Sequence, residues 1–168
     1  MRCNECNRMA SYDLDSEPEV ELEIDGDCHI SGTVRIVLTH DECGNELKEH
    51  TFDVEEDFEM EHRPFTCCKE CNIRQDAEQF FLDKSPCALE GKAHEWEEVE
   101  LNADDHEQEI VDEPTVHLYS RNTAKYRKQR GKTFYGFEGE VEVKCSCGTE
   151  KSIPIKDEIQ ASDMEECN

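Results

Sequence analysis

Paired cysteines restrict how this chain can fold more than any other feature, because 11 of its 168 residues are cysteine. Four motifs place two metal-binding side chains two or three positions apart. They are Cys3-Asn4-Glu5-Cys6-Asn7, His40-Asp41-Glu42-Cys43-Gly44, Cys68-Lys69-Glu70-Cys71-Asn72 and Cys145-Ser146-Cys147-Gly148. Such spacing lets both side chains reach one tetrahedral ion. Each motif ends in Gly or Asn, which tolerate the positive φ that often closes such a turn. We call such a turn a knuckle.

Two knuckles supply the four ligands of one closed site, so the sequence predicts two structural zinc ions. The expected ligands are Cys3, Cys6, His40 and Cys43 for the first ion and Cys68, Cys71, Cys145 and Cys147 for the second. Cys67 could replace Cys68 in the second set. Catalytic zinc usually keeps an open position beside three protein ligands, whereas both sets here have four. We therefore expect zinc to stabilise the fold.

Two other roles for cysteine stay open at this point. A free cysteine is often a small buried apolar residue, which is the role expected for Cys28, Cys87 and Cys167 because they have no partner at ligand spacing. A disulfide network is the second alternative and would require an oxidising setting. The first residues are polar, without the apolar region of a signal peptide, so we expect a reducing cytoplasm.

The apolar pattern predicts a mainly β fold with short helices. Period-two alternation marks strands around 20–24, 34–38 and 51–54, with the His40/Cys43 knuckle before the last of these. Strands around 115–119, 134–137, 141–143 and 153–155 surround the Cys145/Cys147 knuckle in the same order. This repeated order predicts an internal duplication, with unit 1 at residues 1–65 and unit 2 at 66–168. Unit 2 would contain an insert at about 73–114 and a basic hairpin loop at about 120–133.

The two sets of paired ligands above small antiparallel strands resemble the zinc-ribbon group of folds. The resemblance covers about 100 residues, namely the two ligand sets and the strands between them, and implies two zinc-ribbon-like units. Zinc ribbons serve many purposes, so the resemblance implies a fold and leaves function open. The long gap between pairs and the C-x-C motif depart from the commonest pattern.

Three further segments complete the expected organisation. Asp76 can cap a short helix that ends at Ser85-Pro86, and residues 157–166 could form a terminal helix. The acidic stretch 95–113 is expected to be a solvated loop or partly disordered. Hydrophobic residues make up only 35% of the chain, so a metal is needed to hold so small a core.

The net charge of −25 argues against general binding to nucleic acid, whose phosphates such a surface repels. Three explanations of the acidity are open: mimicry of nucleic-acid charge, adaptation to salt, and a solubilising surface that steers the protein to a basic docking site. We rank the last first, because runs of charge are usually solvated faces.

One basic segment has the opposite charge and lacks any acid from Ser120 to Phe137. A functional interpretation makes it a projecting contact with nucleic acid or an acidic partner, in which the tyrosine could stack on a base. The alternative is a loop that folds back on the protein's own acids. The expected partner-binding residues are Arg121, Lys125, Tyr126, Arg127, Lys128, Arg130 and Lys132.

No active-site motif is present, since the chain lacks a phosphate-binding Gly-rich loop, a G-x-S-x-G elbow and an H-E-x-x-H helix. We expect a non-enzymatic, zinc-stabilised acidic protein that acts as a protein-interaction or assembly component, for which a virus particle would be a suitable setting. The alternative is an acidic nucleic-acid mimic that inhibits or regulates a nucleic-acid-handling protein. No apolar run has the length of about 20 residues needed to span a membrane.

Overall fold

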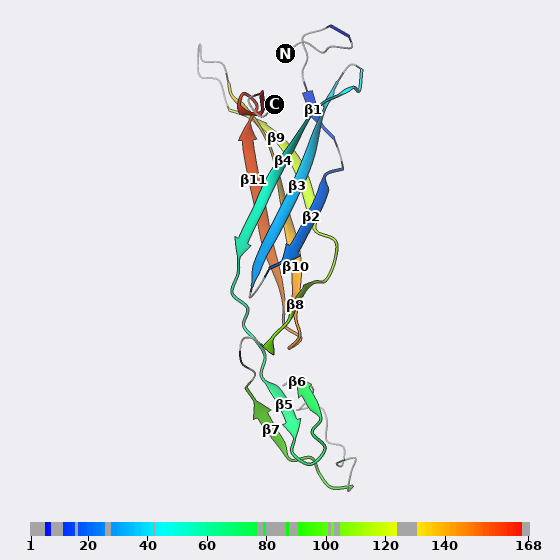
Figure 1. The fold of residues 1–168 in the computed structure, drawn as a ribbon, viewed down its shortest axis with the longest axis vertical. Helices are drawn as coiled ribbons and strands as arrows, with labels where there is room; N and C mark the ends of the chain where they lie inside the picture. Colours follow the sequence, from blue (N-terminus) through cyan, green and yellow to red (C-terminus); the bar gives the residue numbers. More distant parts are fainter. Residues whose placement is uncertain are drawn as a thin grey trace.

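The structure, a computed structural model, contains three antiparallel sheets, with almost no helix among the residues that it describes (Figure 1). It describes residues 6–7, 12–15, 17–25, 28–41, 43–76, 79, 87, 91–100, 102, 105–123 and 131–165. Within these ranges, no helix is long and apolar enough to cross a membrane. The mainly β class predicted from the alternating pattern is therefore confirmed.

The first sheet is built around a long central strand, β3 (His29–His40). β4 (Glu46–Asp57) pairs with one edge of β3, while β2 (Glu19–Ile24) and β1 (Tyr12–Leu14) pair in succession with the other. Alternate side chains of β3, from Ile30 to His40, point inward, as the period-two pattern requires. The strands predicted around residues 20–24 and 34–38 are thus confirmed, and β2 and β3 form an antiparallel pair.

The second sheet has the same arrangement around β10 (Thr133–Cys145). β11 (Glu150–Gln160) pairs with one edge, and β9 (Thr115–Asn122) and β8 (Gln108–Ile110) pair in succession with the other. β10 is continuous, although separate strands were expected at 134–137 and 141–143. Glu138, Gly139 and Glu140 interrupt the apolar run but keep the alternation, because both glutamates face outward.

The two sheets also share an irregularity of register. In the first sheet, the eight residues from Tyr12 to Glu19 span six residues of β3, from His40 back to Arg35. In the second sheet, the eight residues from Gln108 to Thr115 span six residues of β10, from Cys145 back to Glu140. The short first strand is therefore displaced by the same two residues in each sheet.

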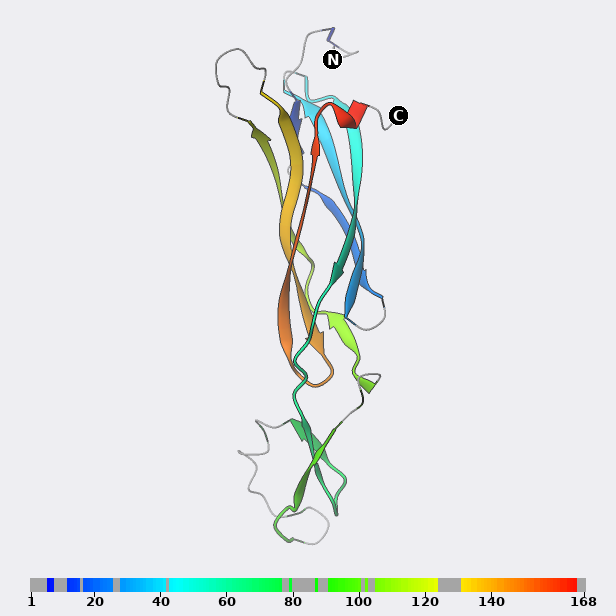
Figure 2. The same cartoon turned by 90° about the vertical axis from the view of Figure 1, so that its left-hand side faces the viewer.

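The two sheets lie face to face and enclose one apolar core, which makes a sandwich (Figure 2). Ile36 and Phe52 of the first sheet and Phe137 and Val141 of the second belong to this core, with the Phe52 and Phe137 rings 5.3 Å apart edge to face. The β3–β4 turn lies at the end of the sandwich that holds the N-terminus, and the β10–β11 turn lies at the other end (Figure 1).

The third sheet is small and lies beyond the β10–β11 end of the sandwich (Figure 1). It contains β5 (Phe65–Cys68), flanked by β6 (Arg74–Asp76) and β7 (Trp96–Val99), and we call it the ribbon sheet. Cys68 is the only fully buried apolar side chain on its described strands, and Cys87 is buried beside them. Among the described residues, the ribbon sheet therefore has no hydrophobic core of its own.

Two expectations about local structure were wrong. Residues 157–160 continue β11, and the chain then forms a single 3-10 turn, η2 (Asp163–Glu165), in place of a helix over 157–166. The acidic stretch 95–113 contains β7 and β8, because pairing with β5 and β10 satisfies its backbone despite the charge. The helix expected after Asp76 lies almost entirely outside the described residues. The boundary at residues 65 and 66 falls at the start of β5, and the division into two units remains a prediction.

Candidate metal centres

The described residues contain three groups of cysteine and histidine whose ligand atoms lie within 4.8 Å of one another and could hold metal ions, zinc among them. We name them by position as the end group, the neck group and the ribbon group. Their respective members are Cys6, His40 and Cys43; His62, His106, Cys145 and Cys147; and Cys68, Cys71, Cys87 and His94.

Three knuckles share one backbone hydrogen-bond pattern. The N–H of the first residue donates to the carbonyl five positions later, from His40 to Asn45 (3.0 Å) and from Cys68 to Ile73 (3.1 Å). The N–H four positions later donates back to the first carbonyl, and its residue has positive φ: 65° at Gly44 and 51° at Asn72. A third knuckle has the same bonds, from Cys87 to Lys92 and from Gly91 to Cys87.

The Cys145 knuckle is one residue shorter. Cys145 N–H donates to Thr149 O (2.9 Å), Gly148 N–H donates to Cys145 O (2.8 Å), and Gly148 has a φ of 87°. Asn7, after Cys6, has a φ of 56°. The positive φ predicted at the Asn or Gly that ends each of the four sequence motifs is therefore confirmed.

The end group lies where β3 turns into β4. His40 is buried at 1% exposure, and its Nε2 and Nδ1 lie 3.9 Å from Cys6 Sγ and 3.5 Å from Cys43 Sγ. The structure thus brings together three of the four ligands predicted for the first ion. The fourth, Cys3, lies outside the described residues.

The neck group lies between the sandwich and the ribbon sheet. His62 Nδ1 is 3.1 Å from Cys145 Sγ and 3.9 Å from Cys147 Sγ, and His106 Nδ1 is 3.4 Å from Cys145 Sγ. The two imidazole rings stack with centroids 3.9 Å apart. Two nitrogens and two sulfurs are a ligand set that tetrahedral zinc accepts.

The two neck thiols differ in acidity. Burial raises the pKa of Cys145. Burial would also raise the pKa of Cys147, but the Thr149 hydroxyl and the Thr149 and Arg63 N–H groups donate to its sulfur and lower that pKa to about 6. Because metals bind the thiolate, these donors favour the form of Cys147 that coordinates.

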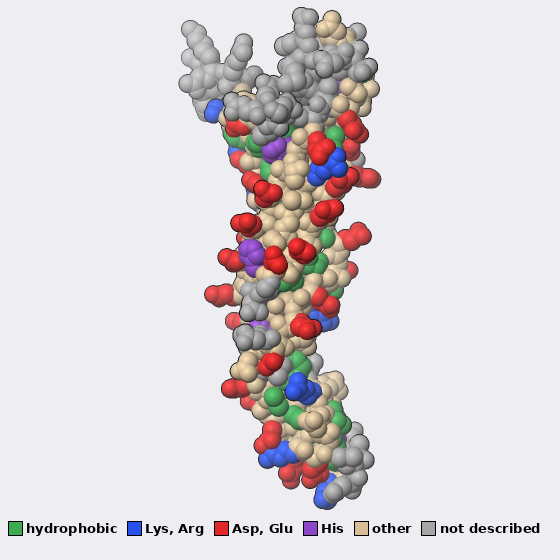
Figure 3. Space-filling view, in the orientation of Figure 1, with side chains coloured by type: hydrophobic (Ala, Val, Ile, Leu, Met, Phe, Trp, Pro, Cys, Tyr) green, Lys and Arg blue, Asp and Glu red, His purple; other side chains and the backbone are tan. Residues whose placement is uncertain are grey.

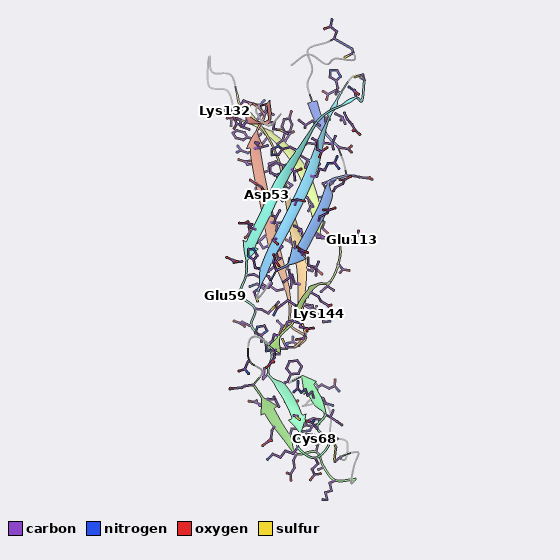
Figure 4. The ribbon with its side chains drawn as sticks, in the orientation of Figure 1. Asp53, Glu59, Cys68, Glu113, Lys132 and Lys144 are labelled. Carbon is purple, nitrogen blue, oxygen red and sulfur yellow. A yellow bond between two sulfur atoms is a disulfide. The ribbon has the colours of Figure 1, made fainter. Side chains whose placement is uncertain are left out.

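The ribbon group joins β5 to the Cys87 knuckle and to His94, which lies just before β7. Figure 4 shows Cys68 within this small sheet. A hydrogen bond from His94 lowers the pKa of Cys68, while His94 Nδ1 is buried without a hydrogen-bond partner. The Cys71 and Cys87 sulfurs are joined as a disulfide, with Cα atoms 6.9 Å apart. That disulfide and a metal held by all four residues exclude each other, so the disulfide alternative stays open for this pair.

The structure does not bring together the four residues predicted for the second ion. Cys68 and Cys71 gather with Cys87 and His94, whereas Cys145 and Cys147 gather with His62 and His106. Three groups therefore exist where two were predicted. Cys87 belongs to one of them, contrary to the role of an isolated buried cysteine that we expected.

Other cysteines and one histidine stay outside the three groups. Cys68 belongs to the ribbon group, and its alternative Cys67 does not. The Cys67 Sγ atom lies 3.3 Å from Asn72 Oδ1 instead. Cys28 is partly buried against the core, and His117 is exposed on β9. Cys167 lies outside the described residues.

The basic segment is described only at its two ends. Arg121 donates to Glu158, with Nε 2.7 Å from Oε2, and its guanidinium lies 4.2 Å above the Phe134 ring. Lys132 N–H donates to the Thr123 hydroxyl (2.8 Å) and closes the base of the hairpin. Arg121 thus pairs with an acid of its own chain, as the alternative interpretation expected. Lys125, Tyr126, Arg127, Lys128 and Arg130 lie outside the described residues.

Comparisons with protein-family models, with curated proteins and with solved structures found nothing that matches this chain.

Proposed function

We propose that this protein is a non-enzymatic, zinc-stabilised interaction or assembly component of the cytoplasm or of a virus particle. In this proposal the three metal groups hold an elongated β scaffold in shape, and the scaffold presents surfaces to a protein partner. The two halves of the sandwich are zinc-stabilised, zinc-ribbon-like repeats of one duplicated unit, a view supported by their common strand order and register step.

The composition and position of the metal groups carry the proposal. The neck and ribbon groups each contain four ligand residues, and Cys3 would complete the end group. Closed sets of four sulfur and nitrogen ligands are typical of structural zinc, since catalytic zinc keeps one position for water or substrate. The groups also lie at the end, at the neck and in the ribbon sheet, where the apolar core is absent or ends.

A groove on the sandwich supports the same view. It has a volume of 660 Å³ and lies over the second sheet, where Glu138, Glu140, Glu142, Glu113 and His117 line it. None of the residues of the three metal groups lines this groove. A metal-assisted reaction in the groove would therefore have no ion close to it.

The basic segment is the surface that we assign to an acidic protein partner. Figure 4 places Lys132 at the end of the molecule opposite Cys68, so this segment and the ribbon sheet are far apart. Acidic side chains predominate over basic ones on the face in Figure 3, which makes a local positive segment a distinctive contact.

Charge reversal tests this assignment. The affinity-tagged protein, purified from its own source, should retain a specific partner that Arg127→Glu, Lys128→Glu and Arg130→Glu together remove. The matched control, Glu97→Gln, Glu98→Gln and Glu100→Gln, should leave partner binding unchanged. Native mass spectrometry should find bound zinc in every variant. A protein that carries no metal, or that binds no partner at all, would contradict the proposal.

One observation favours the alternative, a mimic of nucleic-acid charge. Carboxylates form regular rows on the outward faces of long strands: Glu19, Glu21 and Glu23 on β2, and Glu138, Glu140 and Glu142 on β10. Alternate residues of a strand are about 6.5 Å apart, so each row is an evenly spaced line of negative charge. If binding survives the basic reversal and is lost when the acids are neutralised, this alternative replaces the first.

A further inference from the structure

We propose that a metal ion in the neck group locks the joint between the ribbon sheet and the sandwich, and so holds the ribbon sheet in one orientation. The inference deepens the proposed function and rests on its metal loading. It gives one of the ions a task that the other two do not share.

The neck ligands come from three separate segments of chain. His62 lies on the segment that leaves β4 for the ribbon sheet, and His106 lies on the segment that returns from it to β8. Cys145 and Cys147 lie on the β10–β11 turn, at the adjacent end of the sandwich. One ion bound by all four would therefore join both connecting segments to the sandwich.

The outgoing segment is aligned for this contact. Phe58 is buried in the core, Met60 packs partly against it, and His62 follows at the same spacing of two. The segment thus continues the inward alternation of β4 until His62 reaches the two sulfurs. Next to it, Arg63 N–H donates to Cys147 Sγ at 3.3 Å.

The returning segment is fastened to the same turn. Ser146 N–H donates to Glu107 O (2.8 Å), and Glu107 N–H donates to Ser146 Oγ (3.2 Å). These two bonds place the adjacent His106 against Cys145. The ribbon sheet itself makes no extensive contact with the sandwich strands among the described residues. The neck group is therefore the main cross-connection at the joint.

Burial and charge favour a metal at this position. His106, Cys145 and Cys147 have exposed fractions of 7%, 1% and 2%. Two thiolates and a divalent ion sum to zero charge, which is the least costly arrangement in a buried place. The end group includes the exposed Cys43, and three thiolates with one ion would leave it a net negative charge that solvent can screen.

The single tryptophan makes the joint observable. Trp96, on β7, is the only tryptophan of the chain, so fluorescence reports on the ribbon sheet alone. Its time-resolved anisotropy should decay with the slow tumbling of the whole molecule when the joint is locked. A loosened joint should add a faster component.

The test uses the full chain loaded with zinc, or with cobalt(II) as a spectroscopic probe. Native mass spectrometry should count one metal ion fewer in His62→Gln than in the wild type, which holds three ions when Cys71 and Cys87 are reduced and two when they form the disulfide. Trp96 should gain fast depolarisation in that variant. His62→Cys, which supplies another ligand, should restore both the lost ion and the slow decay. His117→Gln, an exposed histidine, should behave as the wild type.

Each other outcome overturns the inference. If His62→Gln binds as many ions as the wild type, the neck group is not a metal site. If one ion is lost but the anisotropy decay stays slow, the metal does not lock the joint. If His62→Gln fails to fold, a His62→Cys variant with fewer ions than the wild type or with fast depolarisation refutes the inference equally. A wild type without any metal would instead contradict the proposed function itself.

Discussion

The glycine that ends the His40/Cys43 knuckle gives the sharpest test of the knuckle geometry. Gly44 has a φ of 65°, a conformation that side chains with a Cβ atom disfavour. A Cβ added at this position would meet no atom within 4 Å, so the backbone conformation alone sets the cost of a substitution. Asn72 occupies the equivalent position of another knuckle with a φ of 51°.

The expected cost follows from these observations. A residue forced into the left-handed region loses about 1–2 kcal/mol, so Gly44→Ala should lower the free energy of unfolding by that amount. Gly44→Asn should cost less, because Asn tolerates this region, and the β-branched Gly44→Val should cost more. If the turn relaxes when no metal is bound, the penalty is felt only in the zinc-bound form. It then lowers the zinc affinity about fivefold to thirtyfold.

Urea unfolding at saturating zinc measures the first quantity, with unchanged m-values showing that only stability has moved. Competition with a chromophoric chelator measures the second. Gly91→Ala is the matched control, because Gly91 has a φ of 66° and equally free space. The reasoning fails if Asn at position 44 costs as much as Ala, or if Val costs nothing.

Three further predictions concern the core, one histidine and the ribbon sheet. Phe137→Ala should lower the free energy of unfolding, measured in urea, by about 3–5 kcal/mol, because Phe137 is 1% exposed at the centre of the sandwich. A loss below about 1 kcal/mol would place that ring outside the core. The hydrogen bond that His29 Nδ1 donates to Asp57 Oδ1, at 2.6 Å, raises the pKa of His29 above 6.5. The stabilising contribution of this contact is therefore complete below pH 6.5 and is lost as pH rises through the raised pKa. NMR titration should show this shift, and Asp57→Asn should abolish it; an unshifted His29 in the wild type would disprove the contact. A strong chelator should shift Trp96 emission to the red before the β-sheet circular dichroism of the sandwich changes, because the described residues of the ribbon sheet form no apolar core. Simultaneous loss of both signals would argue against this order.

The sandwich strands could be predicted from the sequence because their alternation is strong. Val34, Ile36 and Leu38 alternate with polar or smaller residues, and a strand with one buried face requires that pattern. The positive φ at Asn72 was also predictable, since the backbone of a knuckle demands it locally. Features that a few neighbouring residues determine could therefore be predicted from the sequence alone.

The metal groups could be predicted only in part from the sequence, because the choice of ligands that meet depends on long-range topology. His62 and His106 are 44 positions apart, far from the spacing of two or three positions that marks a pair of ligands. They come together only because the two connecting segments meet. Cys87 did carry a local signal, because Gly91 follows it at the same interval that separates His40 from Gly44. The absence of a second ligand within three positions concealed that signal.

The point at which the chain leaves the sandwich has a consequence for how such proteins can diversify. The segment between β4 and β8 leaves the sandwich and returns to it at the same end, and none of its strands pairs with either large sheet (Figure 1). Its replacement by a different insert would therefore leave every ladder of the two large sheets intact. Recombination at residues 58 and 107 could thus exchange the ribbon sheet for a different terminal module while the sandwich stays the same.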